Sequence, residues 1–475
     1  MIFNSFDFLI FFPFVTIVYF LLPFRLRWIF LLIASYYFYM ANRWKYGTLL
    51  LFTTFIDWLI GLAISRTEDK KLRKWYLAFS LISNLGILFI FKYWNFFADN
   101  LNTLLGFHIP DLKYTLPTNI YLPVGISFYT FQSMSYTFDV YKRHLPAEKN
   151  LGIFALFVSF FPQLVAGPIE RSTNLLPQFY SNQRFSHDRT IQGLRLMIWG
   201  FFKKLCIADV AAIYVNQVYN HVHDYQGWPF ILATYLFAFQ IYCDFSAYSN
   251  IAMGTAKILG FDLMENFNRP YSSQSISEFW RRWHISLSTW FKDYLYVPLG
   301  GNKSGKGKWI RNILIVFILS GLWHGANWTF VIWGALHAIY IIFGRLTLPF
   351  RERIWQITGL ESNSKIKKLF KIIITFHLIC FAWIFFRANS LSDAFHIISN
   401  IIPSSMTTLE ISISIKLVIA FIIAMQIFYF FSAQKTHDYI ASRPIGFRWV
   451  LYLIFTFGIL IFGNFSEIQF IYFRF

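Results

Sequence analysis

The sequence has few charged residues and very few cysteines for its length. Only 14% of its 475 residues are Asp, Glu, Lys or Arg, while 56% are hydrophobic and 22% are aromatic. So little charge cannot cover the surface of a soluble globular protein, which excludes that class. The three cysteines, Cys206, Cys243 and Cys380, are scattered, which argues against disulfides and against a metal site. The composition predicts an all-α, polytopic membrane protein.

The sequence also lacks the motifs of several enzyme and transporter classes. It contains no Gly-x-Ser-x-Gly elbow, no phosphate-binding Gly-Lys-Ser/Thr loop and no His-Glu-x-x-His pair. These absences remove the main support for a hydrolase, a nucleotide-driven pump or a metalloprotease. There is no repeat of fixed period and no low-complexity segment. We therefore expect one integral membrane domain over residues 1–475.

Positive charge is in excess, with 42 Lys and Arg against 23 Asp and Glu. The basic residues cluster in short loops between apolar runs, as the positive-inside rule requires, so we expect a lipid bilayer and not nucleic acid as the partner. The basic loop at 66–74 is then cytoplasmic, which places the N-terminus outside. The first apolar run has no basic n-region and no small-residue cleavage site, so we expect it to remain as the first span.

Apolar runs of suitable length for membrane helices recur along the whole chain. We expect about eleven true crossings, with two or more re-entrant or interfacial pieces among the remaining apolar segments. The runs lie at 6–23, 28–41, 47–65, 75–97, 121–138, 151–166, 190–215, 228–256, 309–323, 328–347, 368–386, 411–431 and 447–463.

One stretch, Glu278–His337, carries polar and titratable residues at the depth where a membrane chain tolerates them least. If Trp309 marks the membrane interface, His324 lies about 22 Å further along a helix, inside a hydrocarbon core roughly 30 Å thick. Gly321 and Gly325 lower helix propensity on either side of the histidine, so the backbone is expected to loosen there. Broken backbone at membrane depth must be buried in protein or line a wet cavity, which predicts a pocket around His324.

The first part of this stretch has a different character. Aromatic residues recur at helical spacing from Phe279 to Phe291, but charged residues interrupt them, which predicts a two-faced, re-entrant or interfacial helix. His284 lies one turn after Trp280 and one turn before Ser288. A second histidine is therefore placed where it could face the same cavity as His324.

The loop between the two histidines is basic, with Lys303, Lys306, Lys308 and Arg311. By the positive-inside rule this loop is cytoplasmic, so His324 is approached from inside and lies toward the outer half of the membrane. Two interpretations of the loop remain open. The cations are topology signals only, or they also hold an anionic acyl donor or an acyl-carrier protein.

A histidine in such a pocket suits general-base activation of a hydroxyl group, because neutral imidazole titrates close to working pH. In acyl transfer from a thioester, one general base would accelerate the reaction by a factor of about 10²–10⁴. Aromatic side chains around it would exclude the water that could hydrolyse the thioester. The alternative interpretation of His324 is a packed, hydrogen-bonded residue. His337 is expected near the opposite end of the next span, and His377 is interpreted as packing.

These residues carry a family resemblance. The segment EFWRRWHISLSTWFKDYLYVPLGGN, followed by SGLWHGANWTFVIWG, resembles the membrane-bound O-acyltransferase family, and within it the bacterial alginate O-acetylase branch. The likeness extends over most of the chain up to about Phe395. Its other carriers are LPVGISFYTFQSMSYTFDVY, FFPQLVAGPIER, QIYCDFSAYSNIAMG, the turn NRPY and FAWIFFRANSLSDAF.

The resemblance implies a ring of membrane helices around a thin central wall pierced by a tunnel. It implies that His324 matches the family's catalytic histidine and that His284 matches a second histidine with a supporting role. It further implies transfer of an acyl group, usually acetyl, from a cytoplasmic thioester such as acetyl-CoA, which is a donor substrate and not a bound cofactor. The acyl group would pass outward across a bacterial cytoplasmic membrane, commonly to an extracytoplasmic partner with a serine-esterase-like (SGNH-type) domain that acetylates a polysaccharide.

Other functions remain open at this point. A D-alanyl or lipid acyltransferase would share the fold, and a transporter would use the broken helix and the basic loop as a pathway without chemistry. The acceptor polysaccharide, and the choice between a partner serine and the sugar as the attacking hydroxyl, also remain open.

Overall fold

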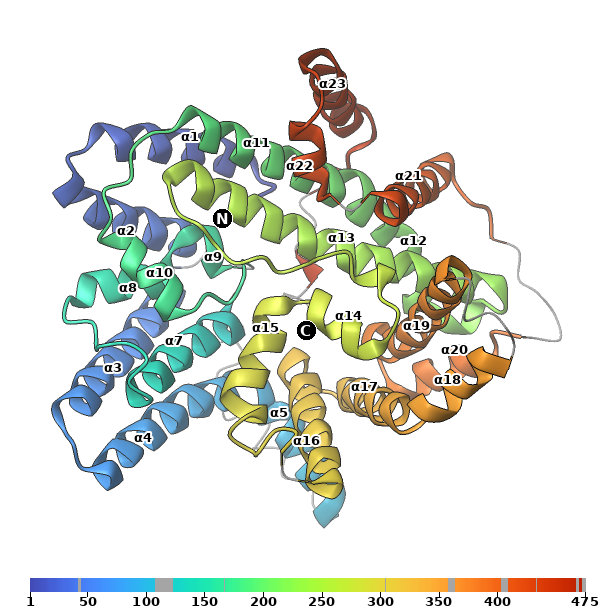
Figure 1. Cartoon of the computed structure of the whole chain (residues 1–475), viewed down its shortest axis with the longest axis horizontal. Helices are drawn as coiled ribbons and strands as arrows, with labels where there is room; N and C mark the ends of the chain where they lie inside the picture. The colour runs from blue at the N-terminus through green and yellow to red at the C-terminus, as the bar shows by residue number, and fades with distance from the viewer. Residues whose placement is uncertain are drawn as a thin grey trace. The chain divides into compact units, whose positions relative to one another are not determined.

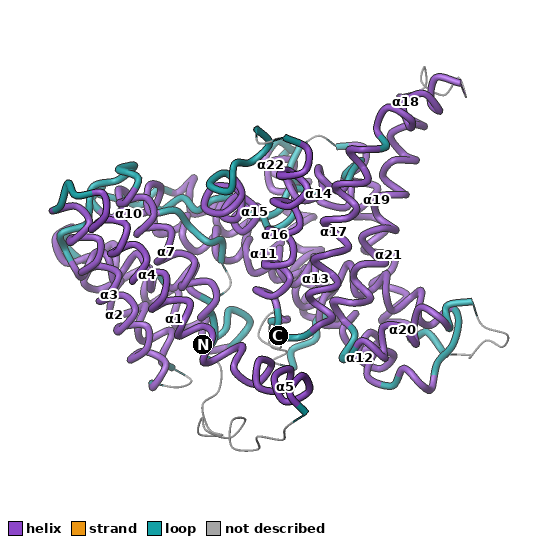
Figure 2. Tube along the Cα trace, turned by 90° about the horizontal axis from the view of Figure 1, so that it is seen from below, coloured by secondary structure: helices purple, strands orange, loops and turns teal. Residues whose placement is uncertain are grey.

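The computed structural model consists of helices and loops, with no strand among the described residues (Figure 2). This confirms the predicted all-α class. The chain divides into a first compact unit, mainly Met1–Met197 with Tyr248–Met264, and a second, mainly Ile198–Ala247 with Glu265–Phe473. The prediction of one domain over 1–475 stays a prediction. The described residues are 1–41, 44–106, 123–165, 167–303, 305–357, 364–402, 409–432, 434–466 and 470–471.

The first unit is built mostly from the N-terminal helices (Figure 1). A π-helical turn, η1 (Phe89–Tyr93), joins α4 to α5, so these elements form one long helical segment. The helices in chain order are α1 (Phe6–Leu21), α2 (Phe24–Met40), α3 (Lys45–Arg66), α4 (Lys70–Leu88), α5 (Trp94–Leu105), α7 (Ile126–Tyr141), α8 (Leu151–Ser159), α9 (Phe161–Leu164), α10 (Ser172–Phe179) and α11 (His187–Phe202).

The second unit begins within α11, continues through the π-helical η2 (Lys203–Ala208) and shares the long α13 with the first unit. Its elements are α12 (Asp209–Asn220), η3 (Val222–Asp224), α13 (Trp228–Leu259), η4 (Pro270–Ser272), α14 (Ile276–Arg282), α15 (Ile285–Phe291), η5 (Lys292–Tyr296), α16 (Lys306–His324), α17 (Trp328–Leu346), α18 (Leu348–Ile357), α19 (Ser364–Arg387), α20 (Leu391–Ser399), α21 (Ile413–Phe431), α22 (Thr436–Ala441) and α23 (Ile445–Phe462).

Several helices present apolar side chains outward, as a lipid environment requires. None of the residues of α23 is buried within the protein, and Phe457 and Leu460 on it are 55% and 63% exposed. The chain is therefore a multi-pass membrane protein, while the number of about eleven crossings stays a prediction. Among the described residues, seven helices are long and apolar enough to cross a membrane: Lys45–Arg66, Lys70–Leu105, Trp228–Leu259, Trp328–Leu346, Lys365–Arg387, Ile413–Phe431 and Ile445–Phe462.

Most predicted apolar runs coincide with helices, but the run at 151–166 does not form a single one. Helix α8 ends at Ser159, and Phe160 adopts a non-helical conformation before the short α9 begins. Pro162 explains the break, because its ring and missing N–H are tolerated in the first turn of a helix but not in its interior. The predicted run at 121–138 becomes α7 from Ile126 onward, and its first two residues lie outside the described residues.

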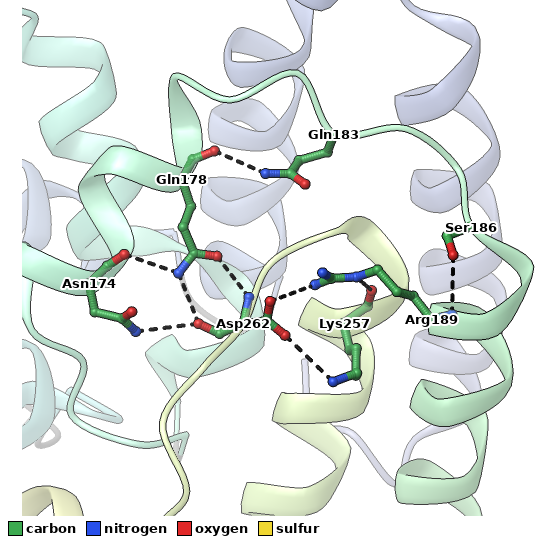
Figure 3. Close-up of polar contacts among 7 residues, drawn as sticks. All are labelled: Asn174, Gln178, Gln183, Ser186, Arg189, Lys257 and Asp262. Atoms are coloured by element: carbon green, nitrogen blue, oxygen red, sulfur yellow. Dashed lines mark hydrogen bonds and ion pairs between the residues drawn. The ribbon is translucent and has the colours of Figure 1, made fainter.

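In the first unit, the segment that follows α13 is held by a polar cluster shown in Figure 3. The Gln178 side chain accepts from the backbone N–H of Asp262 (2.8 Å) and donates to its carbonyl (3.0 Å). Arg189 and Lys257 lie 3.0 and 3.6 Å from the Asp262 carboxylate. The cluster therefore fixes both the backbone and the carboxylate of Asp262.

Glu170 is a second carboxyl near this segment. Burial raises its pKa, and a hydrogen bond from the Asn174 side chain opposes this shift.

Helices α16 and α17 of the second unit form an antiparallel pair in close contact (Figure 1). Glycines allow this approach: a Cβ on Gly321 would lie 2.2 Å from the Phe330 carbonyl oxygen, and one on Gly334 would lie 2.2 Å from that of Phe317. The backbone was predicted to loosen at both Gly321 and Gly325. The structure corrects this at Gly321, because α16 continues to His324 and breaks only at Gly325.

We expect Gly321→Ala to destabilise the protein by about 1–3 kcal/mol, because the added Cβ meets backbone of α17 that no side-chain rotation can move. Thermal unfolding in detergent would measure the loss. Gly344→Ala on α17 is the matched control, since a Cβ there meets nothing within 4 Å. Equal unfolding temperatures for the two variants would contradict a glycine-dependent contact between α16 and α17.

Candidate active site

His324 is the last residue of α16, where the helix stops against Gly325. Its side chain is buried, with 2% of its surface exposed. Aromatic rings surround the imidazole, whose centroid lies 4.9 Å from that of Trp323, 5.0 Å from Trp333 and 5.3 Å from Phe386. These rings would keep water from a reaction at the imidazole. The pocket predicted around His324 stays a prediction.

His284 is also buried, but it does not lie within a helix as predicted. The aromatic stretch forms two short helices, α14 and α15, and His284 occupies the break between them with φ 43° and ψ 54°. A residue other than glycine in this left-handed region carries strain of about 1–3 kcal/mol, and such strain is concentrated at functional sites. The sequence pattern did not indicate the break, because the aromatic spacing is the same on both sides of it.

Asn266 fixes the orientation of the His284 ring. Its side-chain Oδ1 lies 3.2 Å from His284 Nδ1 and also accepts from the backbone N–H and the hydroxyl of Ser286 (3.2 and 2.9 Å). Because an amide oxygen only accepts, His284 Nδ1 carries the ring proton, and Nε2 is the atom that can take up a proton. Sequence reasoning missed Asn266, which is 18 residues from His284 and belongs to no recognisable motif.

The two predicted site histidines are brought together through Trp323. The centroid of the Trp323 ring lies 6.0 Å from that of His284 and 4.9 Å from that of His324. Both histidines therefore contact the same aromatic ring, while the cavity that they were predicted to share stays a prediction.

His337 is placed differently from the prediction. It lies in the middle of α17, and its ring centroid is 4.9 Å from that of Trp333, whose other neighbours include His324. The prediction assumed one continuous helix, whereas the chain reverses between Gly325 and Asn327, where the Asn327 side chain caps α17 by accepting from the N–H of Thr329. The reversal lays α17 back along α16, so His337 packs beside Phe317 of α16, with 6.3 Å between the ring centroids.

A buried charge cluster was also missed. Lys204 Nζ lies 2.8 Å from carboxylate oxygens of both Asp209 and Asp244, and all three side chains are at most 4% exposed. The neighbouring Lys203 donates to the hydroxyl of Ser246 (2.6 Å). The sequence did contain a signal for this cluster, because Lys203 and Lys204 are adjacent inside the apolar run at 190–215. Charged residues within a membrane segment mark functional or packing sites.

The cluster bears on the site through α13. Phe245 lies between Asp244 and Ser246 in sequence, and its ring centroid is 4.6 Å from that of His284. The lysines therefore hold the part of α13 that supplies an aromatic wall to His284.

The predicted basic loop is exposed. Lys306, Lys308 and Arg311, which we call the basic edge, project from the first turns of α16, at the opposite end of that helix from His324. Among the described residues no group of His, Cys, Asp and Glu has the arrangement of a metal site.

Comparison of the sequence with those of known proteins identifies a family and several relatives. A sequence model of the membrane-bound O-acyltransferase family matches residues 141–388, just over half of the chain. The chain is 40% identical over 401 residues to the probable alginate O-acetylase AlgI of Pseudomonas aeruginosa, covering 83% of this chain and 73% of that protein. It is 34% identical to the peptidoglycan O-acetyltransferase of Helicobacter pylori, covering 78% and 73%. The teichoic acid D-alanyltransferase of Bacillus subtilis is 27% identical, covering 65% and 77%.

Proposed function

The chain belongs to the membrane-bound O-acyltransferase family and is an acyltransferase, and from this we propose that it transfers acetyl groups for O-acetylation of a cell-envelope or secreted polysaccharide. The observation that carries the proposal is the similarity over most of the chain to relatives named as alginate and peptidoglycan O-acetyltransferases. The D-alanyltransferase is similar at lower identity and over less of the chain, so D-alanyl transfer is the second candidate.

In this proposal His324 is the general base. Its imidazole accepts the proton of an attacking hydroxyl group while the hydroxyl oxygen bonds to the acyl carbon. The rings of Trp323, Trp333 and Phe386 around it support this role, because they exclude water that would hydrolyse the donor. His284 has a supporting role, since its ring is oriented by Asn266 and contacts Trp323, which in turn contacts His324.

The proposed donor is an acyl thioester, acetyl-CoA or an acetylated carrier protein, which acts as a substrate and not as a resident cofactor. Both carry negative charge, which suits the basic edge of α16. The positive-inside rule puts this edge on the cytoplasmic side, where thioesters are made, so the protein is proposed to reside in the bacterial cytoplasmic membrane.

The proposed acceptor lies on the other side of the membrane. A partner with an SGNH-type esterase-like domain would receive the acetyl group on a serine and pass it to the polysaccharide, or the sugar hydroxyl would attack directly. A transporter without chemistry is the remaining alternative, and it offers no reason for the acyltransferase relatives.

The test uses the full-length protein in inverted membrane vesicles supplied with acetyl-CoA labelled in the acetyl group. We expect label to pass to polymer or to a co-expressed SGNH-type partner only when the protein is present. A D-alanyl carrier thioester serves as the competing donor. Transfer of D-alanine without transfer of acetyl would reject the acetyl assignment, and movement of an unmodified solute without acyl transfer would reject the enzyme.

Two substitutions of His284 separate backbone strain from the role of the ring. His284→Asn should fold like the wild type, because asparagine tolerates the left-handed conformation. We expect it to slow acetyl transfer about 10-fold, which corresponds to the loss of about 1.4 kcal/mol of transition-state stabilisation. His284→Ala should reduce the rate of acetyl transfer as much as His284→Asn does. It should also unfold at a lower temperature, because alanine tolerates the left-handed conformation less well than asparagine. Full activity of His284→Asn would contradict any role of the imidazole.

A further inference from the structure

One face of α17 carries three buried polar side chains spaced four residues apart. Thr329, Trp333 and His337 are 1%, 0% and 0% exposed. Residues at this spacing lie above one another on a helix, about 6 Å apart. Thr329 Oγ1, Trp333 Nε1 and His337 Nε2 have no hydrogen-bond partner among the described residues. We call these three side chains the α17 polar row.

The hydrogen-bonding character of the row follows from its neighbours. Trp280 Nε1 donates to His337 Nδ1 (3.2 Å), and since an indole N–H can only donate, the proton of the neutral His337 ring is on Nε2. Trp333 Nε1 is likewise a donor. The row therefore presents two N–H donors and one hydroxyl, and buried donors are costly unless an acceptor meets them. Oxygen atoms are the acceptors that such a row would bind.

The order of the row relative to the site is set by the antiparallel pairing of α16 and α17. Arg345 near the end of α17 lies over the ring of Trp309 near the start of α16, at 4.5 Å, so that end of α17 is at the basic edge. A chain reaching inward from the basic edge would therefore meet His337 before Trp333. Trp333 is the member of the row whose ring contacts His324, at 5.0 Å and 87° between the ring planes.

We propose that the α17 polar row binds the acyl donor, with Trp333 Nε1–H bonded to the acyl carbonyl oxygen and His337 Nε2–H bonded to an amide carbonyl further along the donor's arm. Coenzyme A and carrier proteins share an arm whose first amide is separated from the thioester by sulfur and two methylene groups, a length comparable to one helical turn. The inference deepens the proposed function and rests on it.

In the proposed step the acceptor's hydroxyl group attacks the acyl thioester, and the thiol is the leaving group. The acceptor's hydroxyl oxygen forms a bond to the acyl carbon while His324 takes its proton, and the carbonyl π electrons move onto oxygen, where the Trp333 N–H stabilises them. The electrons then return, the carbon–sulfur bond breaks, and the departing thiolate takes the proton from the His324 imidazolium. The products are an acetyl ester and a thiol, with no other reactant required.

The first test replaces only the N–H of Trp333. Incorporating β-(3-benzothienyl)alanine at this position keeps the ring's shape against His324 and substitutes sulfur for the N–H. We expect kcat to fall about 10²-fold, as for other lost oxyanion donors, with little change in the KM for acetyl-CoA. Trp383→Phe is the control, because Trp383 stacks on Trp333 but donates its own N–H to Tyr271. Unchanged kcat in the isostere would overturn the proposal.

The second test pairs His337 variants with two small donors. S-acetyl-N-acetylcysteamine contains the first amide of the arm, whereas S-butyl thioacetate does not. We expect His337→Phe to lower kcat/KM about 10-fold for the amide donor only, the effect of one lost hydrogen bond. His337→Gln, which keeps one acceptor and one donor, should restore most of it.

Failure of donor binding by the row and failure of acetyl transfer itself give different results. An equal loss with both small donors in His337→Phe means that the His337 N–H binds water or only supports packing, and this overturns the assignment of the row. Wild-type protein that transfers acetyl from none of the donors would instead reject the proposed function itself.

Discussion

The His324→Ala protein is expected to insert and fold but to transfer acetyl groups about 10²–10⁴-fold more slowly than the wild type, the range for loss of a general base. The physical reason is that no other side chain among its described ring neighbours, Trp323, Trp333 and Phe386, can accept a proton. Polymer-bound O-acetyl groups in cells and label transfer in vesicles both measure the loss. Membrane level and unfolding temperature are measured in parallel.

A second histidine provides the control for this prediction. His377 lies on another membrane helix, α19, is exposed and pairs with the hydroxyl of Tyr235 at 2.8 Å. His377→Ala should keep acetyl transfer close to the wild-type rate, because the ring contacts of His377 are with Tyr235 and Phe376 and not with the rings around His324. Retained polymer acetylation in His324→Ala, or an equal loss in both variants, would remove His324 from the role of base.

The largest loss of stability is expected for Lys204→Met, at about 3–5 kcal/mol. Lys204 lies 2.8 Å from carboxylate oxygens of both Asp209 and Asp244, so its removal leaves two buried carboxylates without their shared cation. Lys257→Met is the matched control. Its partner Asp262 is 58% exposed, so water screens the pair, and the expected change is below about 1 kcal/mol.

A compensating variant distinguishes charge from packing at this cluster. Adding Asp209→Asn and Asp244→Asn to Lys204→Met removes the unbalanced charges, and we expect part of the lost unfolding temperature to return, because the penalty comes from unpaired buried carboxylates. Thermal unfolding in detergent provides the measurement. If Lys204→Met alone unfolds at the wild-type temperature, the cluster does not stabilise the second unit.

Local sequence signals predicted most of the helices and the break after His324. Apolar runs predicted segments such as α21 and α23, because length and hydropathy are properties of the segment itself. Local signals also predicted that α16 ends near Gly325 and that the next apolar helix begins at Trp328. The signals failed at His284, where a break occurs inside an unbroken aromatic pattern, and at Gly321, which serves a contact with α17 and does not loosen its helix.

The candidate site shows the same division. His324 and His284 stood out because a histidine in an apolar segment is conspicuous in the sequence itself, and their family resemblance pointed to catalysis. Three other residues did not stand out, because their importance depends on contacts that form only in the folded protein. Asn266 contacts the His284 ring, Lys204 lies between two carboxylates, and Trp333 contacts the His324 ring. The misplacement of His337 has the same origin, since only the folded helices show that its ring and that of His324 both contact Trp333.

The sequence by itself determined that this is an all-α membrane protein of the O-acyltransferase family, since composition, apolar run length and motif identity are carried along the chain without reference to folding. Only the tertiary structure decided which side chains surround each histidine, how α16 and α17 pair, and where buried charges find their partners. Those contacts join residues from separate helices, and their geometry depends on close packing between backbones.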